Sequence, residues 1–201
     1  HNGSLDIAKK LIDIAVEEKP SGEIYANAGA GTSGGSFGFG IKENNFLGNG
    51  ISLDTNVELS NNAFKGKFSV TNPNLNNSDK SLFISAEAIE NDNYETFGYK
   101  TNKKGVSIGT NFEYFNDFYL GLSSSNFYEI IDTNSTASAQ QKAQEGNYWD
   151  SFLKFDMNYD KRNQKFQTSS GFKSFYSLDL PLVSDKNTIK NYYNYSYYFD
   201  F

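Results

Sequence analysis

Residues 149–159 read WDSFLKFDMNY, and a large apolar side chain stands at nearly every second position. One parity contains Trp149, Leu153, Phe155, Met157 and Tyr159, whereas the other contains Lys154, Asp156 and Asn158. Successive side chains of a β-strand point to opposite faces. The stretch therefore predicts a strand with one apolar face and one polar face.

The same period-two pattern recurs along most of the chain. It predicts ten strands near residues 22–32, 35–44, 50–60, 66–76, 80–91, 104–115, 117–132, 147–160, 171–184 and 191–201. Helical spacing of apolar residues is found only over the short stretch 5–11. Strands of roughly 9 to 11 residues are typical of tilted membrane-spanning β-strands.

The connections between the expected strands alternate in character. One set is mostly tight (44–50, 76–80, 115–117 and the somewhat longer 161–171), and the other set includes the longer polar segments 91–104 and 133–147, although its first member, 32–35, is short. Outer-membrane barrels have short periplasmic turns and longer extracellular loops. The tight set therefore predicts the periplasmic rim, and the long set predicts the extracellular rim.

Composition limits the class of protein further. Only 37% of the residues are hydrophobic, yet 16% are aromatic, which is unusual for a disordered chain. A soluble β-sandwich or a lipocalin-like barrel would also alternate apolar and polar residues. Aromatic residues near the expected strand ends, such as Tyr114, Trp149 and Tyr159, favour a membrane barrel because such barrels carry aromatic girdles.

The sequence offers little material for catalysis, metal binding or nucleic-acid binding. It contains no cysteine and one histidine, and its net charge of −6 lacks the basic balance that phosphate binding needs. Residues 29–34 satisfy the dinucleotide pattern G-x-G-x-x-G, but an expected strand follows them where that site needs a helix. We therefore expect no enzyme activity, no catalytic residues, no metal or other cofactor and no nucleic-acid partner.

A further set of segments is spread in order from about residue 11 to residue 201. They are VEEKPSGEI (16–24), GTSGGSF (31–37), IKENNFLG (41–48), SVTNP (69–73), FGYKTNK (97–103), QEGNY (144–148) and YDKR (159–162), the last followed by Phe166 and Gly171. This set resembles the BamA family of outer-membrane protein assembly factors, in its alphaproteobacterial form. The family usually has a proline two positions after the residue matched by Phe166, and Thr168 stands there in this chain.

The resemblance implies a fold, a set of motif residues and a function. Residues 1–20 would be the end of the last periplasmic POTRA domain, and residues 21–201 would be the first ten strands of an all-β, antiparallel transmembrane barrel of about sixteen strands. The motif residues with a structural role would be Asn72, Pro73, Asp160, Arg162, Phe166 and Gly171. The function would be the folding and insertion of other barrel proteins into the bacterial outer membrane. Its partners would be unfolded barrel clients, accessory assembly lipoproteins and outer-membrane lipid.

The first expected strand supports a mechanism for that function. Ile24 and Tyr25 are its only large side chains, followed by Ala26, Asn27, Ala28 and Gly29. Such a strand packs weakly against lipid, and an unpaired strand edge inside a membrane accepts an incoming strand. We therefore expect these six residues to pair with a client strand.

One alternative function remains open from the sequence. The chain could form a complete ten-stranded barrel, acting as a pore or an adhesin, because its end YYFDF (197–201) resembles the aromatic end of outer-membrane proteins.

The segment 11–20, with Ile12, Ile14 and Val16 on one parity, is expected to lie outside the barrel wall because Pro20 lacks an N–H for the strand ladder.

Overall fold

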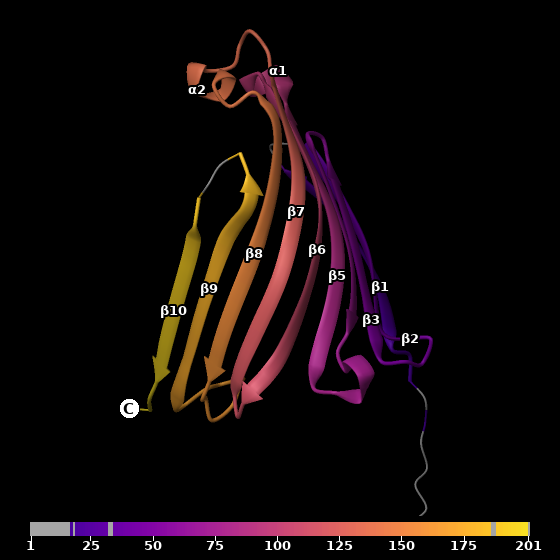
Figure 1. Ribbon diagram of the computed structural model, residues 1–201. Helices are drawn as coiled ribbons and strands as arrows, with labels where there is room; N and C mark the ends of the chain where they lie inside the picture. The colour runs from indigo at the N-terminus through magenta and orange to yellow at the C-terminus, as the bar shows by residue number, and fades with distance from the viewer. Residues whose placement is uncertain (1–16, 18, 32–33, 186–187, 201) are drawn as a thin grey trace, which may run out of the picture.

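The computed structural model describes residues 17, 19–31, 34–185 and 188–200. Ten strands form one antiparallel sheet in which each strand pairs with its neighbours in chain order. They are β1 (Gly22–Gly31), β2 (Gly34–Phe46), β3 (Ile51–Ser60), β4 (Ala63–Asn72), β5 (Lys80–Asn93), β6 (Tyr99–Phe115), β7 (Phe118–Thr133), β8 (Gly146–Asp160), β9 (Gly171–Ser184) and β10 (Lys190–Tyr198). The sheet curves like part of a barrel wall, with β1 and β10 at its two edges (Figure 1). The prediction of ten antiparallel strands is therefore confirmed.

The two ends of the sheet are distinguished by short helices. Helices α1 (Tyr94–Phe97) and α2 (Ala139–Lys142) lie together at one end, which we call the helical end (Figure 1). The opposite end, which we call the turn end, has the turns at residues 47–50 and 116–117 and the short 3₁₀ helix η1 (Leu75–Asn77), whereas the short turn at 61–62 lies at the helical end. No helix in the described part of the chain is long and apolar enough to cross a membrane.

The prediction of a long loop at residues 91–104 is wrong. β5 continues to Asn93 and β6 begins at Tyr99, so only α1 and Gly98 separate the two strands. Both parities are polar here, which removes the period-two signal. The strands persist because their polar side chains pair across the sheet: Lys100 Nζ lies 2.7 Å from Glu90 Oε1 and 3.2 Å from Asp92 Oδ2.

The expected strand at 66–76 begins three residues earlier and ends four residues earlier than predicted. β4 runs from Ala63 to Asn72, and Pro73 lies in the turn that follows. Proline has no N–H to donate to a strand ladder, so the ladder ends before it. The strand's early residues were missed because Lys65 and Lys67 stand beside Gly66, where no large apolar side chain marks the alternation.

The register between strands places the apolar sets on a single face, which we call the apolar face. Phe155, for example, lies opposite Leu122 of β7 and Leu178 of β9. This face is not covered by protein: Ile84 is 52% exposed and Val106 is 55% exposed. A surface of this kind suits lipid rather than a protein core.

The other face, which we call the polar face, carries opposite charges directly across from one another. The pairs in register are Lys42 with Asp54, Glu58 with Lys65, Lys67 with Glu87, Lys103 with Glu129, Lys154 with Asp179, and Asp160 with Lys173. Opposite charges on facing positions stabilise a pairing, whereas a slip of one residue would move them to the apolar face. The polar face therefore helps to specify the register of the sheet.

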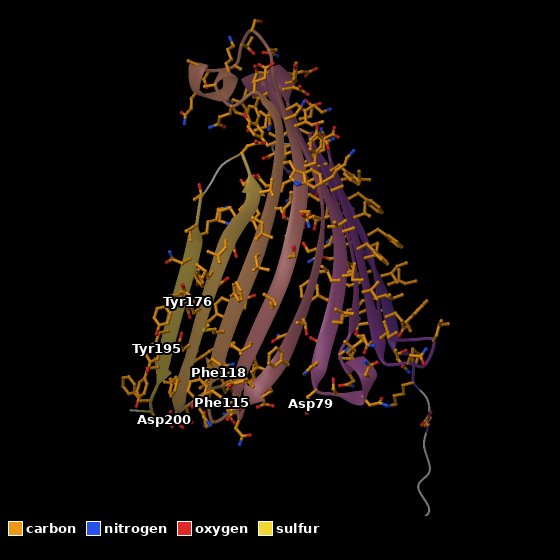
Figure 2. All side chains as sticks on the ribbon, in the orientation of Figure 1. Asp79, Phe115, Phe118, Tyr176, Tyr195 and Asp200 are labelled. Atoms are coloured by element: carbon orange, nitrogen blue, oxygen red, sulfur yellow. The ribbon has the colours of Figure 1, made fainter. Side chains whose placement is uncertain are left out.

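Aromatic side chains gather toward both ends of the apolar face. At the turn end the Phe115 and Phe118 rings stack at 4.6 Å between centroids, and the Phe118 ring meets Tyr159 edge to face at 5.8 Å. Figure 2 shows Phe115, Phe118 and Tyr195 near this end. Toward the helical end, the Tyr128 and Trp149 rings lie 6.4 Å apart. The two clusters confirm the aromatic girdles that the sequence predicted.

Candidate functional site

The residues predicted to pair with a client all lie on β1, the first edge of the sheet. β1 pairs with β2 along its whole length, and all ten of its residues are exposed. Among the described residues no other strand pairs with it. The structure thus brings Ile24, Tyr25, Ala26, Asn27, Ala28 and Gly29 together on one edge of the described sheet.

The side chains of β1 alternate between the two faces, and those on the apolar face are mostly small. Ile24, Ala26 and Ala28 lie opposite Ile41, Phe39 and Phe37 on the apolar face. Because Ala26 and Ala28 are small, the large lipid-facing groups of this hairpin belong to β2, apart from Ile24 at the start of β1. β1 is therefore anchored to the apolar face chiefly through its neighbour.

On the polar face, two larger side chains of β1 lie over glycines of β2. Tyr25 is opposite Gly40 and Asn27 is opposite Gly38. A Cβ atom at Gly40 would overlap the Tyr25 ring, and one at Gly38 would overlap the Asn27 carboxamide. These two glycines hold β1 against β2, a role that our sequence analysis missed. The signal was the alternation of glycine with phenylalanine over residues 37–40.

The hydrogen-bond alternation shows which backbone groups of β1 are free. The Asn44 N–H donates to the Ser21 carbonyl at 3.1 Å, so these opposed residues form a hydrogen-bonded pair. In an antiparallel ladder such pairs occur at every second position. Tyr25, Asn27 and Gly29 therefore bond to β2, whereas Ile24, Ala26 and Ala28 direct their N–H and C=O groups away from the sheet. This free ladder can take up one more strand by β-augmentation.

The motif residues at the end of β8 form a compact cluster at the turn end. Arg162 Nε donates to Asp160 Oδ1 at 2.8 Å, and Arg162 Nη2 donates to Asp160 Oδ2 at 2.7 Å. The Arg162 side chain is 15% exposed and the Asp160 side chain is 14% exposed. Gly171 has a φ of +102°, and a Cβ there would overlap the Lys161 carbonyl. The bidentate pair and the glycine together close the turn between β8 and β9.

Three other residues of this turn, Phe166, Thr168 and Lys161, stand apart from the cluster. The Phe166 side chain is 80% exposed, so it does not pack on the Asp160–Arg162 pair. The Thr168 hydroxyl donates to the Gln164 carbonyl at 2.7 Å, a bond that a proline at this position could not make. The Lys161 ammonium lies 2.8 Å from Asp117 Oδ2, and this hydrogen bond raises the pKa of Lys161.

Asn72 and Pro73 form a second structural motif at the turn end, after β4. The Asn72 carboxamide oxygen accepts a hydrogen bond from the Asn74 N–H at 3.1 Å. This bond turns the chain toward η1 directly after the proline. Asn72 and Pro73 thus act on the β4–β5 connection, and Asp160, Arg162 and Gly171 act on the β8–β9 connection. No residue of either motif belongs to the β1 edge.

The comparison with known families follows the strands described above. Residues 45–201 match the Omp85 superfamily domain. The chain belongs to the Omp85 superfamily. This membership indicates the bacterial outer membrane, as the sequence predicted.

A solved structure shares the fold of this Omp85 chain. The crystal structure of BamA from Haemophilus ducreyi, lacking POTRA domains 1-3, superposes with a TM-score of 0.64 at 22% sequence identity. The match covers 84% of this chain and 36% of that chain, so this chain spans about a third of the BamA structure. No curated protein matches the chain. The fold prediction, a segment of a BamA-type barrel, is therefore confirmed.

Proposed function

We propose that this chain forms the first part of the barrel of an outer-membrane protein assembly factor. The factor folds and inserts barrel clients by pairing a client strand with β1, and it needs no covalent chemistry. The single observation that carries the proposal is the small size of the β1 side chains: on its outward-directed backbone ladder only Ile24 is large, and Ala26 and Ala28 give the strand little anchorage in lipid.

Physical chemistry supports this use of the edge. Unpaired N–H and C=O groups are costly inside a membrane, because no water is present there to bond them. A client strand that reaches β1 removes that cost on both sides. Ala26 and Ala28 bury little surface against the client because their side chains are small. They therefore offer little resistance when the folded client later separates from β1.

The wider assembly also forms part of the proposal. Residues 1–20 would be the end of a periplasmic POTRA domain; of these, the structure describes only residues 17, 19 and 20, which have no regular secondary structure. The expected segment 11–20 outside the barrel wall therefore lies largely outside the described residues. Accessory lipoproteins and outer-membrane lipid would be further partners.

The alternative is a complete ten-stranded barrel that acts as a pore or an adhesin. Such a barrel requires its first and last strands to pair. Within the described part of the chain, the sheet order runs from β1 to β10 without any pairing between these two strands. The described residues therefore form no closed ten-stranded barrel, and in the larger barrel of an assembly factor further strands would lie between β10 and β1.

Cysteine crosslinking in the full-length protein tests the proposal. A cysteine at Asn27 should crosslink to a cysteine in the last strand of a stalled client, because residue 27 lies on the free edge strand. A cysteine at Asn158 is the matched control, since this asparagine also lies on the polar face but β8 is paired on both sides. Equal adducts at 27 and 158, or none at 27, would contradict templating by β1 and favour the pore or adhesin.

A further inference from the structure

One lysine lies in an unusual place on the apolar face. Lys104 of β6 is directly opposite Ala88 of β5 and Tyr128 of β7. Among the described residues, every other charged side chain of this face lies within three residues of a strand end. Lys104 lies five residues inside β6, next to Val106 and Ile108, which are 55% and 48% exposed.

The charge of Lys104 is not compensated within the described part of the protein. Three charged residues of the apolar face between Lys104 and the helical end, Glu90, Asp92 and Lys100, pair with one another instead. A charged side chain on the lipid-facing surface of a barrel is costly near the midplane and inexpensive near an interface. Tyr128, directly opposite Lys104, and Trp149 beyond it mark such an interface.

A shallow depression begins beside Lys104. Its volume is about 600 Å³, and it extends across the apolar face from β3 to β8. Small residues make it hollow: Gly66 is directly opposite Ala88, and Ala86 lies between Phe68 and Val106. Lys104, Asn126, Tyr128 and Trp149 line the side toward β8. An apolar trough with one cation at its margin matches a lipid that has an acyl chain and an anionic headgroup.

Asn126 adds a specific polar group to this surface. It lies on the apolar face opposite Val106 of β6 and Ser151 of β8. Its side chain has no hydrogen-bond partner within the described part of the chain. A carboxamide has both donors and an acceptor, so full pairing needs a ligand that both accepts and donates. Acyl ester linkages only accept hydrogen bonds, whereas acyl amide linkages and free hydroxyl groups both donate and accept.

We propose that this depression binds a phosphorylated glycolipid with amide-linked acyl chains. The phosphate pairs with Lys104, an amide or hydroxyl group bonds to Asn126, and one acyl chain covers Gly66, Ala86 and Ala88. The position agrees with this class of lipid, because Lys104 lies five residues from the start of β6 at the helical end, and the long-loop rim of outer-membrane barrels is extracellular. The site is separate from the β1 edge and would order lipid on the wall of the barrel.

Native mass spectrometry of the full-length protein in detergent tests the site, with diphosphorylated lipid A as the added probe. Lys104→Met should weaken retention of lipid A about fivefold, the usual effect of one basic residue at a membrane surface. Lys80→Met is the matched control, because Lys80 also lies on the apolar face but at the turn end. Ala88→Leu keeps the charge and fills the hollow, so it should also weaken retention. Heat-modifiable migration in gels verifies that each variant is folded.

Three outcomes would overturn the proposal. The first is retention by Lys104→Met equal to that of the wild type. The second is an equal loss in Lys80→Met, which would indicate general attraction to basic residues. The third is displacement of lipid A by an equal concentration of phosphatidic acid, which has an anionic phosphate and two acyl esters but no amide and no free glycerol hydroxyl. This would show that charge alone is recognised and that Asn126 selects neither group.

Discussion

At the scale of single residues, the clearest contrast is between two ion pairs of neighbouring residues. Arg162 and Asp160 form two parallel hydrogen bonds and are largely buried, whereas Lys161 and Asp117 are 39% and 50% exposed. Hydrogen bonds to charged groups gain strength when water is excluded, and exposed pairs contribute little. The turn after β8 thus depends on the arginine more than on the lysine beside it.

Arg162→Ala should therefore lower the free energy of unfolding by about 2 kcal/mol, because it leaves the Asp160 carboxylate without its main partner. Lys161→Ala should lower it by less than about 1 kcal/mol. Equilibrium urea unfolding of the full-length protein in lipid vesicles measures both values. A loss of similar size in the two variants would show that the bidentate geometry has no special role in this turn.

At the scale of elements, the backbone N–H and C=O groups of β1 point alternately toward β2 and away from the sheet. Asn27 bonds to Gly38 of β2, while Ala28 directs its N–H to the free edge. Proline is tolerated in an edge strand where its missing N–H would have faced away from the sheet. The two neighbouring positions therefore separate the stability of the hairpin from its capacity to accept a client.

Ala28→Pro should keep β1 paired with β2 and reduce client folding severalfold, because one donor of the free ladder is lost. Asn27→Pro should weaken the β1–β2 hairpin itself and reduce client folding at least as much. Hydrogen exchange of the β2 amides reports the hairpin, and the rate of assembly of a barrel client in proteoliposomes reports the function. Client folding by Ala28→Pro at the wild-type rate would argue against pairing through this edge.

At the scale of the whole molecule, the sheet behaves as a wall between two different surroundings. Its apolar face is exposed and bounded by aromatic clusters, and its polar face carries opposite charges in register. Among the described residues, Ala137 is the one buried hydrophobic residue, so no protein core supports the sheet. In a soluble protein a core removes apolar side chains from water. Here lipid on the apolar face must do so, while the polar face contacts water.

Two adjacent residues of β8 test this division. Phe155→Arg on the apolar face should lower the free energy of unfolding by about 2 to 4 kcal/mol, because the charge would enter lipid near the midplane. Asp156→Arg on the polar face should lower it much less. Unfolding of the full-length barrel in lipid vesicles gives both values, and equal losses would contradict the assignment of the two faces.

Local sequence pattern is enough to predict where most of the strands lie and which side chains share a face. Period-two alternation is a local property, so residues 149–159 predicted β8 and its two faces without any knowledge of their neighbours. The same local character limited the prediction at 91–104, where polar residues stand on both parities and only pairing of Lys100 with Glu90 and Asp92 maintains the strands.

Only the tertiary structure decided how the strands lie against one another. The free ladder of β1 depends on the bond between Asn44 and Ser21, and the place of Lys104 depends on Ala88 and Tyr128. These partners are 16 to 24 residues away along the chain, and their positions follow from the register of paired strands. Register is a property of two strands together. The spacing within one strand therefore cannot show which edge is free, or which small side chains meet to form a hollow beside a lysine.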